Sequence, residues 1–273
     1  MKRAVKTENH AMRKTGMTLC ELLIVTGVLV VLAVLLLPAL ATPPGPRRRS
    51  SCQNNLKQMG LIFKMYSNES KGQYPPVSSV PGNWVPSMAA IYPEYLTDPT
   101  IVVCPNSPLS HKGVFTLKDN REHPRAKVGS FHPDCAAPLF YVYTGYELLC
   151  DEDAWALGYA RAAMPEGWLG RADIDVTARQ GENAAPFLPV PKLKDTDGDA
   201  SRISGVPVMW DRIGTAKDDS NHTPAGSNVL YADGHVEFKK YGNSNKTDSF
   251  PVTHAAAQVF GDGAPHRSRD CAE

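Results

Sequence analysis

The segment KTGMTLCELLIVTGVLVVLAVLLLPAL, residues 14–40, most constrains how this chain can fold. Its apolar run, residues 22–40, would form a helix of roughly 28 Å, which matches the hydrocarbon thickness of a bilayer. Basic residues precede the run and favour a cytoplasmic N-terminus: Lys2, Arg3, Lys6, Arg13 and Lys14. The sequence therefore predicts a transmembrane helix over residues 17–41.

Composition limits the rest of the chain. The 29 Lys and Arg residues nearly balance the 28 Asp and Glu residues, so there is no electrostatic case for a nucleic-acid partner. The 23 prolines and 21 glycines indicate a loop-rich domain with short strands. We expect an α+β fold, with one globular domain over residues 50–250 and a C-terminal tail over 251–273.

Glu21 stands at the head of the apolar run. An ionised carboxylate at membrane depth costs about 2.5–3.5 kcal/mol, so this side chain needs a partner or a position at the headgroup level. Where the chain is cut decides what that partner is. The ALATPP segment, residues 39–44, resembles a signal-peptidase site, and a cut near Ala41 would release an exported protein without the apolar run.

The residues KTGMTLCE, 14–21, resemble the processing site of type IV prepilins and type II secretion pseudopilins. In that family a basic leader ends in glycine, and a glutamate is fifth in the mature chain. The resemblance implies a leader over residues 1–16 that ends at Gly16, a mature N-terminus at Met17 that becomes N-methylated, and Glu21 in the fifth place. Pro38 also falls where the family tends to have a proline.

This resemblance gives Glu21 a role. Cleavage after Gly16 creates an α-amine on Met17, which is cationic at neutral pH. Glu21 of one subunit would pair with that amine on a neighbouring subunit and fix the register of a filament, with Pro38 in the packed helix. The implied partners are a prepilin peptidase, an inner-membrane assembly machinery, other pilin-like subunits and the membrane.

The next segment, TPPGPRRR, predicts a break in the helix at residues 42–49, because stacked prolines remove donors and clash with the preceding turn. A second helix is expected over residues 50–70, opened by a capping box of Ser50 and Gln53. Its apolar stripe recurs at helical spacing and would pack on a sheet: Cys52, Leu56, Met59, Phe63 and Tyr66. The wording CQNNLKQMG resembles a branch of pilin-like proteins common in planctomycete-type and verrucomicrobial-type bacteria.

Near the C-terminus, NHTPAGSNVLYADGHVEFKKYG, residues 221–242, resembles the prepilin-associated motif of a histidine, nine residues and Asp-Gly, with one extra residue here. Alternating apolar residues on either side of Asp233 and Gly234 predict a hairpin with a two-residue type I′ turn. Three interpretations of His222, Asp233 and His235 remain open: a turn that closes the fold, a metal site, or a catalytic group.

The run DTDGDAS carries Asp195, Asp197 and Asp199 at alternate positions, like the start of a calcium loop. Ala200 and Val206 replace the glycine and the glutamate that an EF-hand requires. The resembled family includes calcium-binding pseudopilins, so a calcium site of another kind and a simple polar loop both stay open. We expect no other cofactor.

Two cysteines, Cys52 and Cys104, stand where the resembled branch also carries cysteines, which implies a disulfide between the second helix and the first strand. A second candidate pair is Cys135 with Cys150. That would leave Cys271 over, in the tail.

Three further elements are expected outside these motifs. Residues 151–164 are typical of a short helix opened by acidic residues, and LFYVYTGY and GVPVMWDR are typical of strands. The sequence contains no nucleophile elbow, no phosphate-binding glycine loop and no paired-carboxylate arrangement with meaningful spacing. Nothing in it therefore calls for an enzyme.

Together these patterns predict a structural subunit of a periplasmic or surface filament, and the pseudopilin resemblance implies a role in type II protein secretion. It would be a single-pass inner-membrane protein with its N-terminus in the cytoplasm and its C-terminal domain in the periplasm. A membrane-anchored binding protein that keeps the prepilin motif without polymerising is the alternative.

Overall fold

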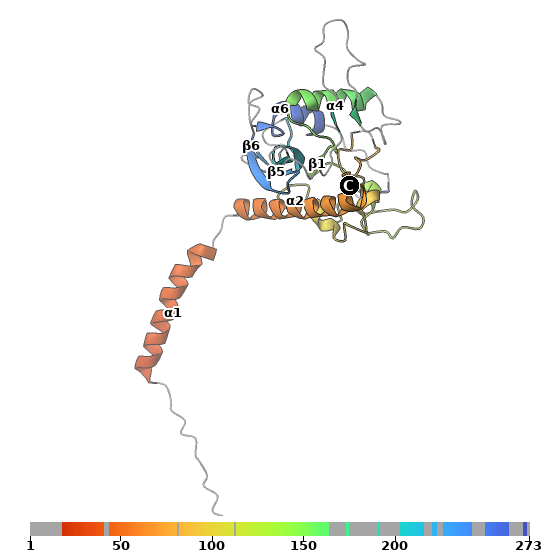
Figure 1. Cartoon of the computed structure of the whole chain (residues 1–273). Coiled ribbons are helices and arrows are strands. Elements are labelled where there is room, and N and C mark those ends of the chain that lie inside the picture. Colours follow the sequence, from red (N-terminus) through yellow and green to blue (C-terminus); the bar gives the residue numbers. More distant parts are fainter. Residues whose placement is uncertain are drawn as a thin grey trace, which may run out of the picture. The chain divides into compact units, whose positions relative to one another are not determined.

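The computed structural model describes residues 18–40, 44–80, 82–111, 113–163, 173–174, 190–191, 203–215, 220–222, 226–241, 249–261 and 270–271. The chain divides into two compact units, Met1–Pro44 and Gly45–Glu273. The first holds one helix, and the second holds a sheet with helices on its two faces (Figure 1).

The helix of the first unit, α1 (Leu19–Leu40), starts with a reciprocal cap. The Thr18 backbone N–H donates to Oε2 of Glu21 at 2.8 Å, and the Glu21 backbone N–H donates to the Thr18 hydroxyl at 3.3 Å. This is the Thr-x-x-Glu capping box, which satisfies two of the orphan donors at a helix N-terminus. Glu21 therefore has a local partner that the sequence analysis missed.

No helix in the described part of the chain is both long and apolar enough to cross a membrane. Such a helix needs about 20 apolar residues, and the side chains of α1 are described only over residues 19–34. The predicted transmembrane helix over residues 17–41 and the inner-membrane placement that depended on it are therefore not supported. The structure shows this segment as the helix α1.

The second unit begins with α2 (Pro44–Glu69), which corrects the predicted break at residues 42–49. Pro44 and Pro46 lie in the first turn, where backbone N–H groups have no intrahelical acceptor, so a missing donor costs nothing there. The expected helix over residues 50–70 is present but starts earlier, and Ser50 does not cap it.

Four antiparallel strands form the main sheet in the order β1-β4-β5-β6. They are β1 (Tyr141–Tyr143), β4 (Pro207–Asp211), β5 (Gly226–Tyr231) and β6 (Val236–Lys240). The register pairs Val142 with Trp210, and Trp210 with Val229. The antiparallel sheet and the strands expected around LFYVYTGY and GVPVMWDR are thus confirmed.

The sheet is covered on both faces, and strand alternation divides the core in two. One cluster includes Leu56, Met59, Phe63, Tyr141, Tyr143 and Leu230, on the face covered by α2. The other includes Val142, Leu157, Trp210, Val229 and Phe260, on the face covered by α4 (Asp151–Ala163) and α6 (His254–Ala256) (Figure 1). Helix α4 confirms the helix expected over residues 151–164.

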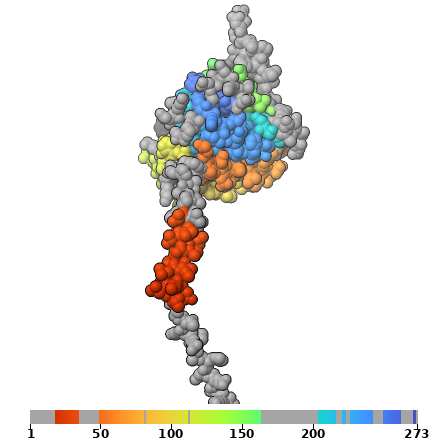
Figure 2. Space-filling view, turned by 90° about the vertical axis from the view of Figure 1, so that its left-hand side faces the viewer, coloured from red at the N-terminus to blue at the C-terminus, as the bar shows by residue number. Residues whose placement is uncertain are grey.

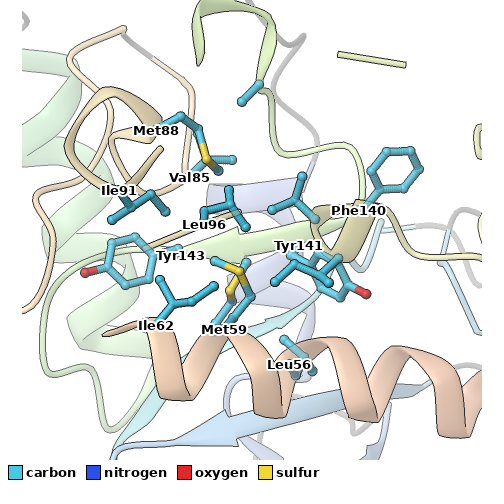
Figure 3. Packing of buried hydrophobic residues seen from close by; sticks show 14 of the residues in the cluster. Leu56, Met59, Ile62, Val85, Met88, Ile91, Leu96, Phe140, Tyr141 and Tyr143 are labelled. Carbon is cyan, nitrogen blue, oxygen red and sulfur yellow. The ribbon is translucent and has the colours of Figure 1, made fainter. Parts of the chain in front are cut away.

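The predicted stripe of α2 is the helix's buried face. Leu56, Met59 and Phe63 have no exposed surface, and Figure 3 shows Leu56 and Met59 pointing from the helix toward Tyr141 of β1. The Phe63 ring lies 5.0 Å from the Tyr143 ring, centroid to centroid. Since these contacts join α2 to β1, an edge strand of the sheet, they also fix the position of Cys52, one helical turn before Leu56.

Short elements complete the second unit. They are α3 (Met88–Ile91), η1 (Pro99–Val102), η2 (Pro133–Cys135), the paired β2 (Asp173–Ile174) and β3 (Val190–Pro191), and the π-helical η5 (Ala257–Gly261), which continues α6. Phe260 of η5 is buried, so the predicted tail over residues 251–273 is wrong for this part.

A disulfide gives a second correction to the predicted C-terminal tail over residues 251–273. Cys135 is bonded to Cys271, which anchors a C-terminal segment that the sequence analysis had left unpaired. The backbone N–H of Lys118 donates to the Asp270 carbonyl at 2.7 Å beside it. The predicted pair of Cys135 with Cys150 is wrong, because Cys150 is free.

Candidate functional site

Four side chains from distant segments meet in the core of the second unit: Cys52, Cys104, Asp211 and His222. Each offers one atom of a kind that binds metals, and these four atoms all lie within 4.8 Å of one another. All four residues are buried. We call this group the Cys-His-Asp cluster.

Two members of the cluster lie in a helix and a strand, and a hydrogen bond fixes the loop of a third. Cys52 belongs to the buried stripe of α2, and Asp211 is the last residue of β4. Cys104 follows η1, and the Asn55 side-chain amide of α2 donates to the Val103 carbonyl at 3.1 Å, which holds the loop of Cys104 against the helix.

The loop of His222 is fixed just before β5. His222 forms an isolated antiparallel bridge with Gly226. The neighbouring Asn221 donates its side-chain amide to the Phe140 carbonyl at 2.7 Å. These bonds hold the imidazole on the side of the sheet where the cysteines lie.

Asp211 is the centre of the polar contacts. Its Oδ2 accepts the backbone N–H of Asn228 at 2.8 Å and the Asn228 side-chain amide at 2.7 Å. The same oxygen lies 2.9 Å from Nε2 of His222. Its second oxygen, Oδ1, is buried and has no hydrogen-bond partner among the described residues.

His222 lies between the carboxylate and the thiols. Its Nε2 is 3.9 Å from Sγ of Cys104 and 3.2 Å from the Asn228 side-chain amide nitrogen. Its other ring nitrogen, Nδ1, is 3.0 Å from the side-chain amide of Asn106. Asn106 also donates to the Asn221 carbonyl, so this amide braces the loop as well as the ring.

The charges in the cluster are strongly coupled. The hydrogen bond from Cys104 lowers the pKa of Cys52 to about 6, against the effect of burial and with help from His222. The same bond, together with burial, raises the pKa of Cys104. Burial lowers the pKa of His222, but its hydrogen bonds to Asp211 and Cys52 outweigh burial and raise it to about 9. The arrangement therefore favours a thiolate beside an imidazolium.

Burial decides what this arrangement can do. Cys52, Cys104 and Asp211 have no exposed surface, and His222 has 1%. A nucleophilic cysteine must be reached by its substrate, and reactive cysteines are partly exposed. A buried set of sulfur, nitrogen and oxygen donors is better suited to joining segments of the fold than to turning over a substrate.

A second group of donors is formed by His123, His132 and Asp134. Nε2 of His123 is 3.4 Å and Nδ1 of His132 is 3.8 Å from Oδ2 of Asp134. Burial, and then the neighbouring His123, lower the pKa of His132. Because the Asp134 side chain is 57% exposed, water competes with the two histidines for its carboxylate.

The hairpin motif is present, but its turn differs from the prediction. The Gly234 N–H donates to the Tyr231 carbonyl at 2.9 Å, and the Tyr231 N–H donates to the His235 carbonyl at 3.0 Å. The loop thus holds three residues, and only Gly234, with φ +91°, lies in the left-handed region. This is the three-residue turn with a glycine bulge, not a type I′ turn.

The three residues of the metal interpretation, His222, Asp233 and His235, do not come together. Asp233 and His235 are paired at 2.6 Å beside the turn that follows β5, and the His235 ring stacks on Tyr231. His222 lies at the opposite end of β5 in the Cys-His-Asp cluster. The metal interpretation of that trio is therefore wrong.

The remaining predicted sites fall in three places. Gly16 and Met17, and the three calcium candidates Asp195, Asp197 and Asp199, lie outside the described residues. Glu21 and Pro38 lie in α1. The predicted disulfide between Cys52 and Cys104 is not formed, since both thiols are free. The two side chains nevertheless belong to the same Cys-His-Asp cluster.

Asp211 was missed altogether. It follows a strand-like run, where an acidic residue is usually the exposed end of the strand. No short sequence motif links it to Cys52, Cys104 and His222. Comparison with protein-family models, with curated proteins and with solved structures returned no match to this chain. The resemblance to pilin-like proteins therefore rests on the motifs quoted above.

Proposed function

We propose that this chain is a pilin-like structural subunit, cut after Gly16 by a prepilin peptidase and assembled with other pilin-like subunits through α1. The observation that carries this proposal is the surface of α1. Every described side chain of this helix is exposed, and nearly all are apolar.

The extent of that surface matters. Leu19 is 75% and Ile24 66% exposed. The other large exposed apolar residues surround the helix on all sides: Leu22, Leu23, Val25, Val28, Leu29, Val30, Val31, Leu32 and Val34. A helix that is hydrophobic all round is stable only when other apolar groups cover it. Helices of the same kind from neighbouring subunits provide that cover in the proposed filament.

Glu21 fits the same assembly. It is the one acidic or basic residue in α1, and the hydrogen bonds from the backbone and the hydroxyl of Thr18 lower the pKa of its carboxyl. The carboxylate is therefore charged and held at the first turn. Cleavage after Gly16 would place a cationic α-amine on Met17, so the Glu21 of an adjacent subunit meets an opposite charge where the helices pack.

The second unit is suited to be a rigid head. Its sheet is covered on both faces, a disulfide anchors its C-terminal segment, and its Cys-His-Asp cluster is buried. In such an arrangement the second unit supplies bulk and surface to the filament, and α1 supplies the contacts between subunits.

Cys20 offers a direct test, because this exposed thiol lies in the first turn of α1 beside Glu21. In cells with active prepilin peptidase, a thiol-specific crosslinker should join neighbouring subunits into covalent dimers on a denaturing gel, because each Cys20 thiol reacts once. Cys20→Ser should abolish these dimers, and the matched control Cys150→Ser, which changes a partly buried free thiol, should leave them intact.

Two outcomes would contradict the proposal. A dimer band that is equally strong in cells without the peptidase would show association that does not depend on processing. A processed chain that never crosslinks through Cys20 would instead indicate a protein that keeps the prepilin motif but does not polymerise.

A further inference from the structure

We propose that Cys52, Cys104, Asp211 and His222 together bind one Zn²⁺ ion, which joins α2 to the sheet from inside the core. This inference is independent of the proposed filament, because all four residues belong to the second unit.

The donor set selects the metal. Two sulfurs, one imidazole nitrogen and one carboxylate oxygen form a four-ligand set of the kind that zinc binds tetrahedrally. Calcium and magnesium take oxygen ligands and would reject the two thiols. Ideal zinc distances of about 2.0–2.3 Å imply about 3.3–3.8 Å between ligand atoms. The donor atoms all lie within 4.8 Å of one another, and two of their distances fall just outside that range on either side: Nε2 of His222 is 2.9 Å from Oδ2 of Asp211 and 3.9 Å from Sγ of Cys104.

An orphaned atom provides the second observation. Oδ1 of Asp211 is buried without a hydrogen-bond partner among the described residues. An unsatisfied buried acceptor destabilises a fold, and more so when it is charged. A cation at the centre of the cluster would give Oδ1 the partner that it lacks among the described residues.

The surroundings resemble the outer shell of a metal site. The two amide N–H groups of Asn228 hold Oδ2 of Asp211 in place. The Asn106 side-chain amide nitrogen lies 3.0 Å from Nδ1 of His222 and also donates to the Asn221 carbonyl, so it fixes both the imidazole ring and its loop.

A disulfide between Cys52 and Cys104 is the competing interpretation. It would consume two of the four ligands and leave the buried Asp211 and His222 as an ion pair with Oδ1 still unsatisfied. Zinc uses all four groups. It also joins four segments, α2, the loop after η1, the end of β4 and the loop before β5, so its binding energy adds to folding energy.

The test uses the full chain, purified in mild detergent and reductant without chelator. Elemental analysis should find about one zinc per chain. Cys104→Ser and His222→Ala should lower that content several-fold, and Asp211→Asn, which keeps the shape of the side chain, should lower zinc affinity at least 10-fold. The controls Cys150→Ser and His123→Ala, the latter in the exposed donor group, should retain the zinc.

Because some variants could fail to fold, a spectroscopic measurement on the unaltered chain is decisive. Replacement of zinc by Co²⁺ should give the intense visible bands of tetrahedral cobalt and a near-ultraviolet thiolate-to-cobalt band, both lost on chelation. Mass mapping under non-reducing conditions should then find Cys52 and Cys104 as free thiols. A Cys52–Cys104 disulfide in a metal-free chain, or a cobalt spectrum without the thiolate band, would overturn the proposal.

Discussion

The helices α1 (Leu19–Leu40) and α2 (Pro44–Glu69) are of similar length, yet their apolar side chains are distributed in opposite ways. On α2 the apolar side chains form one stripe that the sheet buries, and the other side stays on the surface of the second unit (Figure 2). On α1 the apolar side chains surround the helix and all those described are exposed. The fold therefore depends on α2, whereas the function we propose depends on α1.

The largest effect that separates the two helices should come from truncating the centre of the α2 stripe. Phe63 is fully buried and its ring lies 5.0 Å from that of Tyr143, so Phe63→Ala should lower the free energy of unfolding by about 3–5 kcal/mol. Leu61→Ala, at a residue of the same helix that is 66% exposed, should change it by less than about 0.5 kcal/mol. Urea denaturation of both variants checks this, and equal losses would remove the distinction between the two sides of α2.

A matched glycine substitution should sharpen the comparison. A Cβ at Gly60 would lie 3.1 Å from Cδ1 of Leu230, whereas a Cβ at Gly27 of α1 would meet nothing within 4 Å. Gly60→Val should therefore cost about 1–3 kcal/mol by overpacking, and Gly27→Val should leave the unfolding of the second unit unchanged. Thermal melts followed by near-ultraviolet circular dichroism, which reports the packed aromatic residues, distinguish the two.

A smaller effect is expected at the start of α1. Thr18→Ala removes the hydroxyl that accepts the Glu21 N–H, so the first turn should lose about 1 kcal/mol of stability. Amide exchange should become faster in that turn of α1 and stay unchanged in α2. Thr18→Ser, which keeps the hydroxyl, should exchange at the original rate. Equal exchange rates in the alanine variant and the unaltered chain would mean that the capping box does not hold the turn.

The smallest effect should come from the exposed end of α2. The Tyr95 hydroxyl donates to Oε2 of Glu69 at 2.5 Å, and this bond raises the pKa of Tyr95 to about 12. Tyr95→Phe should hardly alter the melting temperature, since an exposed hydrogen bond exchanges with water. Spectrophotometric titration should show that the variant lacks one tyrosine that ionises at about pH 12 in the unaltered chain. A large fall in melting temperature would mean that this end of α2 contributes more than its burial indicates.

The sequence predicted elements whose pattern is local. The stripe of Leu56, Met59 and Phe63 identified the buried face of α2, because helical periodicity records which side faces the core. The position of the β5-β6 hairpin was also predicted correctly. Its turn type was not, because the pairing of Tyr231 with His235 sets the loop length, and Asp-Gly is compatible with both turns.

Features that depend on distant segments were beyond the sequence. The partner of Cys135 is Cys271, and no spacing rule selects among cysteines so far apart. The Cys-His-Asp cluster likewise joins residues from Cys52 to His222. The predicted division into two helices is confirmed, but the break predicted at residues 42–49 is wrong from residue 44 on. Proline is compatible with a first helical turn, and the sequence alone does not show where that turn begins.

The central claim is that α1 becomes an assembly helix once the leader is removed, and the mature N-terminus tests it most directly. Intact-mass and terminal-peptide mass spectrometry of the protein from cells with and without prepilin peptidase would locate the cut. The account predicts a chain that begins at methylated Met17 when the peptidase is active and at Met1 when it is absent. A chain that begins near Thr42, without α1, or that begins at Met1 in both kinds of cell, would contradict it.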